Sequence, residues 1–303
     1  MIARPMKLKR VYPAIAVAII AISFASIFIK ALELRSVPPL VIAAYRMLFA
    51  VILLAPWMLI YHRKELAKWD PRDWLLMALS GACLAIHFGA WTFSFKYISI
   101  ARSTVIVDSQ PVFTVIASYL LLKEKPSRWS LIGTILAIAG IVTITLLGDD
   151  AGGEKAAGAS ARLGDLLALV GAISIAFYVL IGRKLRAKVS LLAYVVPLYT
   201  LCAIMLFVAA YLNGDRIGGY ELGDYKYFVA LALVPTILGH TIFNWALKHV
   251  KAGVISVCFL GEPIGATLLA ILFFRQIPSI PTVLCGLLIL AGIYMTTISE
   301  RET

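Results

Sequence analysis

Long apolar runs dominate this chain, and short polar stretches separate them. A bilayer core about 30 Å thick is crossed by about 20 residues of α-helix. Ten apolar runs have about that length, so the pattern predicts ten membrane-spanning helices. We expect them at residues 11–32, 39–61, 73–95, 101–122, 128–147, 164–182, 190–212, 226–247, 252–274 and 281–298.

The composition also indicates an all-α integral membrane protein. Of the 303 residues, 61% are hydrophobic and 15% are charged, and the mean hydropathy is +0.92. Soluble domains are typically about 45–50% apolar and about 25% charged. The net charge of +12 does not indicate nucleic-acid binding, because the basic residues are scattered between the apolar runs. Lipid headgroups and membrane topology account for them better.

The first apolar run follows a basic segment, as in a secretory signal peptide. Arg4, Lys7, Lys9 and Arg10 precede it, and it extends to about residue 32. The apolar region of a signal peptide is shorter, roughly 7–15 residues. We therefore expect a first membrane helix that is retained.

A segment rich in Gly and Ala, residues 148–163, interrupts the series of helices. Its composition is typical of a flexible linker. It divides the chain into a first half, residues 11–147, and a second half, residues 164–298, with five predicted helices each. Loops on the side of the N-terminus carry roughly twice as many Lys and Arg as the opposite loops, which places both termini in the cytoplasm.

The two halves resemble each other at a fixed offset. Pro111 aligns with Pro263, and Pro126 aligns with Pro278, 152 residues further along the chain. Gln110 then lies opposite Glu262. Because each half has an odd number of predicted helices, the halves cross the membrane in opposite senses. Inverted repeats of this kind surround the midplane site of many secondary transporters.

The aligned segments also carry a family resemblance. "DSQPVFTVIASYLLLKEKP" in the first half and "LGEPIGATLLAILFFRQIP" in the second resemble the drug/metabolite transporter superfamily, EamA type. The resemblance covers about residues 11–298. It implies that each half is one EamA domain and that a central cavity exports amino acids, their derivatives or other small metabolites. The chain departs from the commoner pattern at Gln276, where the first half has an acidic residue before its turn.

Few polar residues lie inside the predicted helices, and each needs a physical reason. A charged residue at a helix centre costs about 2.5–3.5 kcal/mol on insertion scales. The candidates for substrate binding are Arg46, His87, Asp108, Gln110, His240, Asn244 and Glu262.

Three of these candidates lie at a similar depth. At 1.5 Å per residue, Arg46, His87 and Asp108 are each about 10 Å from the outer surface of the bilayer core. Arg46 and Asp108 could share the ammonium and carboxylate of a substrate. A static salt bridge that joins the second and fourth helices is an equally valid interpretation.

Glu262 is predicted near the middle of the ninth helix, and so near the midplane of the bilayer. It could bind a substrate ammonium, exchange a proton that is coupled to transport, or serve as a hydrogen-bonded structural acid. Pro111 and Pro263 each leave one carbonyl without its helical partner. Such carbonyls are tolerated where protein, water or substrate reaches them, so both prolines predict kinks beside a cavity, with packing kinks as the alternative.

Secondary transport of a small metabolite is the function that these features predict, with amino acids or their derivatives as the leading substrates. Drugs, nucleosides or sugars are alternatives on the same fold. A membrane enzyme is disfavoured, because the chain has no GxSxG, HExxH or P-loop motif and its histidines share no ligand spacing. A channel or another non-transporting membrane protein is the third class. We expect no cofactor and no metal, and we expect protons as a candidate coupled ion.

Overall fold

A computed structural model describes residues 8–122, 127–147, 159–186, 188–246, 248, 259 and 261–299. Within these ranges the regular elements are all helical. The helices of the first half are α1 (Leu8–Ser23), α2 (Ala25–Glu33), α3 (Pro39–Tyr61), α4 (Arg63–Leu66), α5 (Pro71–Ser94), α6 (Ile100–Val107), α7 (Gln110–Leu122) and α8 (Arg128–Leu147). Those of the second half are α9 (Ala159–Arg186), α10 (Leu191–Leu212), α11 (Leu222–Leu231), the π-helix η1 (Ala232–Thr241), α12 (Ile242–Ala246), α14 (Gly261–Phe274) and α15 (Ile280–Ser299).

Six helical segments of the described chain are long and apolar enough to cross a membrane. They are Pro13–Glu33, Pro39–Tyr61, Pro71–Ser94, Ala159–Arg186, Leu191–Leu212 and Leu222–Ala246. Three shorter apolar helical segments, Leu131–Gly140, Ile264–Phe274 and Ile280–Gly292, lie where further spans were predicted. The predicted span at 252–274 lies partly outside the described residues.

Helix starts follow the capping chemistry that the sequence offers. Pro39 and Pro71 occupy the first turn of α3 and α5, where the missing amide of proline costs nothing. Asp70 caps α5 by accepting a hydrogen bond from the amide of Asp73 at 2.8 Å. Ser99 and Ser190 cap α6 and α10 in the same way.

Two predicted spans are interrupted. The first span divides at Phe24 into α1 and α2, next to a hydrogen bond of 2.9 Å from the Ser23 hydroxyl to the carbonyl of Ile19. Such bonds to the preceding turn bend helices. The fourth span divides at Asp108 and Ser109 into α6 and α7, directly before Pro111. Proline thus stands in the first turn of α7, where it is tolerated.

The eighth span contains a π-helix that the apolar pattern did not predict. The hydroxyls of Thr236 and Thr241 donate to carbonyls five residues earlier, at 2.8 and 3.0 Å. Pro235 lies in the same segment and supplies no amide to an ordinary α-helical bond. π-Helical turns are rare and occur frequently at functional sites.

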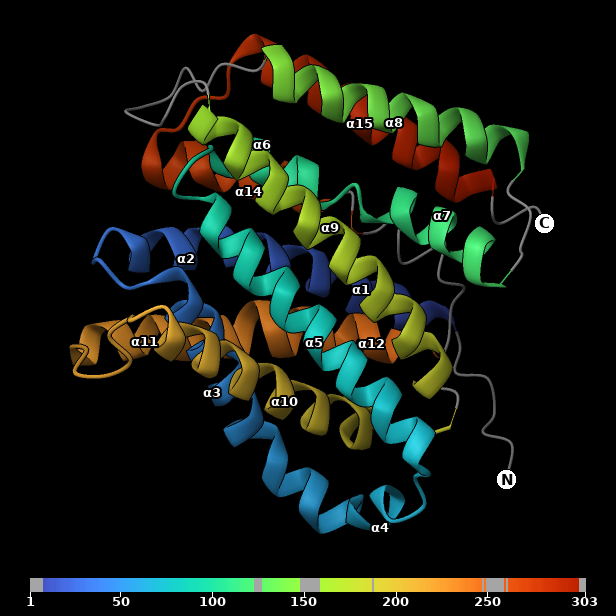
Figure 1. Ribbon diagram of the computed structural model, residues 1–303, viewed down its shortest axis with the longest axis vertical. Helices are drawn as coiled ribbons and strands as arrows, with labels where there is room; N and C mark the ends of the chain where they lie inside the picture. Colours follow the sequence, from blue (N-terminus) through green and yellow to red (C-terminus); the bar gives the residue numbers. More distant parts are fainter. Residues whose placement is uncertain are drawn as a thin grey trace.

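Helices from the two halves pack against each other throughout the bundle. α1 packs on η1. α3 packs on α10, α5 on α9, and α8 on α15 (Figure 1). Gly292 makes the last pair close, because a Cβ there would lie 2.5 Å from the carbonyl oxygen of Gly133. Small residues permit such close contact between helices in membranes.

Helix α9 begins at Ala159, within the segment predicted as a linker. Tertiary packing explains the longer helix, since Ala161 is buried in a cluster with Ile98 and Val105. Residues 148–158 lie outside the described part of the chain.

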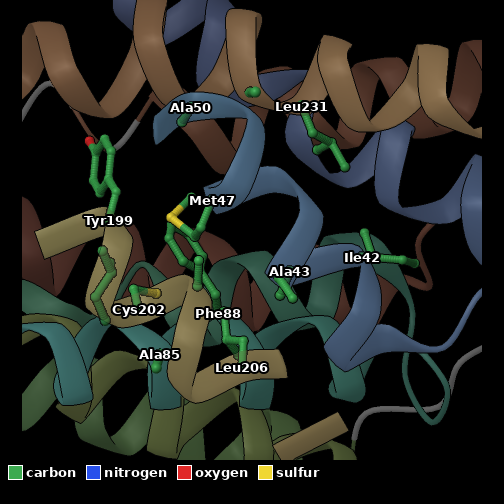
Figure 2. Close-up of a cluster of buried hydrophobic side chains, with 14 of the residues drawn as sticks. Ile42, Ala43, Met47, Ala50, Ala85, Phe88, Tyr199, Cys202, Leu206 and Leu231 are labelled. Carbon is green, nitrogen blue, oxygen red and sulfur yellow. The ribbon is translucent and has the colours of Figure 1, made fainter. Parts of the chain in front are cut away.

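The largest buried cluster joins α3, α5 and α10. Figure 2 shows Met47, Phe88, Cys202 and Leu206 as members of this cluster. Many large apolar side chains lie on the outer surface instead, among them Ile60, Leu212 and Leu272. Hydrocarbon chains can cover such a surface without the cost that water would impose.

Candidate functional site

A buried cavity lies between the two halves of the chain. It has about 10 Å³ of free space, roughly the room of one water molecule. It is lined by His87, Trp91, Val107, Asp108, Gln110, Ile175, His240, Phe259 and Glu262. Five of the seven predicted binding residues therefore meet at this small polar cavity.

Asp108 and Gln110 enter the cavity wall through the break between α6 and α7. Asp108 directly follows α6 as its C-cap, and its backbone has φ −77° and ψ 1°. Ser109 completes the turn by donating a hydrogen bond from its hydroxyl to the carbonyl of Ile106 at 2.6 Å. The break therefore turns a membrane helix into a short polar segment at the level of the cavity.

Several polar atoms around the cavity have no hydrogen-bond partner. Asp108 Oδ2, Gln110 Oε1 and Trp91 Nε1 are buried, and no described residue bonds to them. The carboxylate of Glu262 is also buried and receives no hydrogen bond from the described residues. Burying polar groups without partners costs about 1–3 kcal/mol each, and more for charged groups, so such a set needs an explanation.

His87 contributes an acceptor to the same cavity. Its Nδ1 lies 3.0 Å from the carbonyl oxygen of Gly171 in α9. A carbonyl can only accept, so Nδ1 carries the hydrogen, and the other nitrogen of the neutral ring, Nε2, is an acceptor. Gly171 brings the helices close, because a Cβ there would lie 3.0 Å from Val107.

Arg46 is buried but does not line the cavity. Its Nε donates to the Thr236 hydroxyl at 2.7 Å, and its guanidinium lies 4.1 Å from the centre of the Phe88 ring. No salt bridge joins Arg46 to Asp108 in the described structure. The static pair considered from the sequence is therefore absent, and Thr236 and Phe88 contact the guanidinium instead.

His240 and Asn244 lie at the π-helix and directly after it. His240 lines the cavity and meets Phe88 edge-on, with ring centres 5.5 Å apart. Asn244 lies outside the lining, since its amide donates to the Tyr178 hydroxyl at 2.8 Å and to the carbonyl of His240 at 3.0 Å. Asn244 therefore supports the wall that carries His240.

Glu262 lies in the first turn of α14 and is 6% exposed. Pro263 follows it within that helix. Of residues 249–260, which precede the helix, the structure describes only Phe259. The kink predicted at Pro263 therefore falls largely outside the described residues.

A buried ion pair that the sequence reasoning missed lies between α6 and α9. Arg102 donates from Nε and Nη2 to the two oxygens of Asp165, each at 2.7 Å. The two side chains are 1% and 3% exposed. Both residues lie at the ends of predicted spans, where charges are ordinary. Their opposite signs at the ends of adjacent helices were the available signal.

The described residues contain no group of three or more His, Cys, Asp or Glu side chains that could hold a metal ion. The cavity lining nevertheless combines two carboxyl groups, from Asp108 and Glu262, with two imidazole rings, from His87 and His240. This arrangement suits the reversible binding of a small polar solute.

Comparison with known proteins gives the family. The model of the EamA-like transporter family matches residues 10–146 and again residues 162–298. A model of solute carrier family 35 matches residues 92–209. The two EamA matches divide the chain into two domains of the same kind, which indicates a duplication.

Curated relatives are similar along most of the chain. An uncharacterized transporter of Archaeoglobus fulgidus is 26% identical over 283 residues, which cover 91% of this chain and 93% of the relative. Solute carrier family 35 member G1 of Mus musculus is 27% identical, with 85% and 70% covered. The uncharacterized inner membrane transporter YedA of Escherichia coli strain K12 is 25% identical, with 80% and 76% covered.

A solved crystal structure shares the fold, with a TM-score of 0.63 and 19% identity over 95% of this chain and 98% of the other. The two family matches and the helical bundle therefore agree over nearly the whole chain. This protein belongs to the EamA-like transporter family and is a multi-pass membrane transporter, not an enzyme.

Proposed function

We propose that this transporter exports amino acids or amino-acid derivatives through the cavity between its halves. The observation that supports it most is the set of buried polar atoms without partners on Asp108, Gln110 and Trp91. A solute that enters the cavity can satisfy them, and they can be hydrated again when it leaves. A ligand that restores these bonds offsets the cost of burying them.

We further propose that ten spans form two inverted five-helix repeats. The pairing of helices supports this arrangement. α5 of the first half packs on α9, which opens the second half, and η1 of the second half packs on α1, which opens the first. These are the same contact with the roles of the halves exchanged, as a pseudo-two-fold axis in the membrane plane requires.

The cytoplasmic membrane is the proposed location, with both termini in the cytoplasm. The distribution of Lys and Arg between the loops supports this orientation. The Escherichia coli relative is named an inner membrane transporter, which agrees with the proposed location.

Alternating access is the proposed mechanism. Residues of both halves line the cavity. The helix of the fourth span is interrupted there at Asp108, and the π-helix η1 carries His240 into the same lining. Such discontinuous helices surround the midplane sites of many secondary transporters, where one half rocks against the other. Asp108 and Gln110 would then move with the α6–α7 break.

Charge balance supports a role for protons. Arg46 acts electrostatically on Glu262, and Asp108 is a second carboxyl group in the same cavity lining. If both carboxyl groups ionise, the guanidinium leaves one negative charge unbalanced. A proton or a cationic substrate can balance it, so we propose that the two compete for this cavity.

Counterflow in proteoliposomes tests the proposed function. Purified protein is reconstituted with unlabelled amino acids, amides, nucleosides or sugars inside, and uptake of the labelled compound is measured. We expect saturable exchange of amino acids or their derivatives. In the Glu262→Gln variant this exchange should be lost, or its rate should no longer depend on pH. Exchange of only nucleosides or sugars would assign the same fold to a different substrate class.

A further inference from the structure

We infer that the cavity selects the ammonium end of its substrate and favours amines whose carboxylate is absent or blocked. The preferred ligands are compact apolar amines, such as amino-acid amides, rather than free amino acids. This inference rests on the proposed transport function and names the chemical class that the cavity takes.

The acceptors that face the cavity suit an ammonium group. Asp108 and Glu262 supply two carboxyl groups from the two halves of the chain. His87 adds a neutral nitrogen, because its other nitrogen donates to Gly171. An ammonium group has three N–H donors and no acceptor, so it can use all three of these groups together. Asp108 is 3% exposed and its Oδ2 has no partner, so it is a built acceptor that lacks a donor.

The donors around the cavity are weak by comparison. Trp91 Nε1 and the Gln110 amide are uncharged. Two buried guanidinium groups lie outside the lining. Arg46 donates from Nε to Thr236 and lies over Phe88, and its Nη2 has no partner among the described residues. Arg102 forms two bonds to Asp165. A substrate carboxylate would therefore enter beside two carboxyl groups without a cation in the wall, which like-charge repulsion disfavours.

The remaining wall is apolar and aromatic. Val107, Ile175 and Phe259 line the cavity together with Trp91. The Trp91 ring stacks on His87 with ring centres 6.0 Å apart and an angle of 15° between the planes. Aromatic faces attract cations in addition to burying apolar surface. The chemistry of this lining therefore suits a short branched alkyl group beside an ammonium, in a state of the transporter in which the cavity is wider.

Four related probes separate the ends of the ligand. They are 3-methylbutylamine, leucinamide, leucine and 4-methylpentanoate, which share one alkyl group and differ in their charges. Binding to the full-length protein in detergent is measured by calorimetric titration at pH 7. We expect the amine and the amide to bind at least about ten-fold more tightly than leucine, which equals about 1.4 kcal/mol. The acid should not bind.

Matched variants assign the preference to the cavity. Asp108→Asn is nearly isosteric and should weaken binding of 3-methylbutylamine at least about ten-fold. Asp70→Asn removes a carboxylate outside the cavity and keeps a good helix cap, so its affinities should equal those of the wild type. Should Asp108→Asn not fold, Glu262→Gln provides the same test from the other half.

The outcomes separate this inference from the proposed function. Leucine or 4-methylpentanoate binding as tightly as the amines, or no binding of either amine, overturns the inference. Counterflow of leucine in the same protein would then leave the proposed function intact. Tight amine binding that depends on Asp108, without any counterflow, supports the inference and contradicts the transport mechanism.

Discussion

Two buried groups of charges in this protein behave in opposite ways. Arg102 and Asp165 meet through two hydrogen bonds of 2.7 Å and satisfy each other. Asp108 and Glu262 in the cavity receive no hydrogen bond from any described residue, and Arg46 bonds to a neutral hydroxyl instead. A charge that finds its partner within the protein fixes the fold, whereas a charge that lacks one is available to a ligand.

The largest expected effect comes from breaking the satisfied pair. Arg102→Ala leaves the carboxylate of Asp165 buried at 3% exposure, which should destabilise the protein by about 3–5 kcal/mol. Thermal and chemical unfolding in detergent measure this loss. Arg102→Met combined with Asp165→Leu should recover most of it, because no buried charge is then left alone. A single variant as stable as the wild type would remove the contrast between the two groups.

A smaller effect is expected at Arg46. Arg46→Lys loses the Nε donor to Thr236 and the planar contact with Phe88, at a cost of about 1–3 kcal/mol. The same unfolding assay gives the stability, and amine titration gives the affinity. Because Arg46 lies outside the cavity lining, affinity for 3-methylbutylamine should change by less than about three-fold, or about 0.7 kcal/mol. A loss of affinity as large as that in Asp108→Asn would place Arg46 in direct contact with the ligand.

Asp108→Asn should alter stability least among the buried charges. The substitution breaks no hydrogen bond between described residues, so the unfolding free energy should change by less than about 1 kcal/mol. Asp165→Asn is the matched comparison, and it should be clearly less stable because Arg102 loses its charged partner. Equal losses in the two variants would contradict the division between satisfied and available charges.

The smallest effect is expected at the polar cluster outside the spans, which joins α4 to the start of α10. Burial would raise the pKa of Glu65, but hydrogen bonds from the Ser190 amide and from His62 outweigh it and lower the pKa below its usual 4.5. Glu65 therefore stabilises the fold above about pH 4.5, and this contribution is lost as the pH falls through the lowered folded-state pKa.

Glu65→Gln tests that contribution. At pH 7 it should lower the unfolding free energy by less than about 1 kcal/mol, because the pair with His62 is partly exposed. The difference from the wild type, measured by thermal unfolding across pH, should shrink as the pH approaches 3. A difference that grows on acidification would have the wrong sign for a carboxyl group with a lowered pKa.

The sequence predicted the helices better than their irregularities. Apolar run length places α3 and α8 at the predicted 39–61 and 128–147, because hydrophobic thickness limits both ends. The π-helix was missed, since threonine hydroxyls that bond five residues back leave no mark on an apolar pattern. Depth counting grouped Arg46 with Asp108, but it measures distance along a helix axis and says nothing of the direction in which a side chain points.

The sequence identified candidate residues by one criterion, namely a polar side chain inside a predicted apolar helix, where its burial is costly. Asp108, Glu262 and His240 were chosen for that reason, and all three line the cavity. Trp91 lay in a longer group of aromatic residues that nothing in the sequence could rank. Phe88, which stands between Arg46 and His240, has no polar atom to draw attention to it.

The uneven number of charges around the cavity also has an electrical consequence. Moving one positive charge out of a cell against a potential of 100 mV, negative inside, costs about 2.3 kcal/mol. A cavity with two carboxyl groups can carry an amine outward and a proton inward in alternation. The exchange would then transfer no net charge, so the voltage across the membrane would neither drive nor oppose it, and the pH difference together with the amine gradient would set its direction.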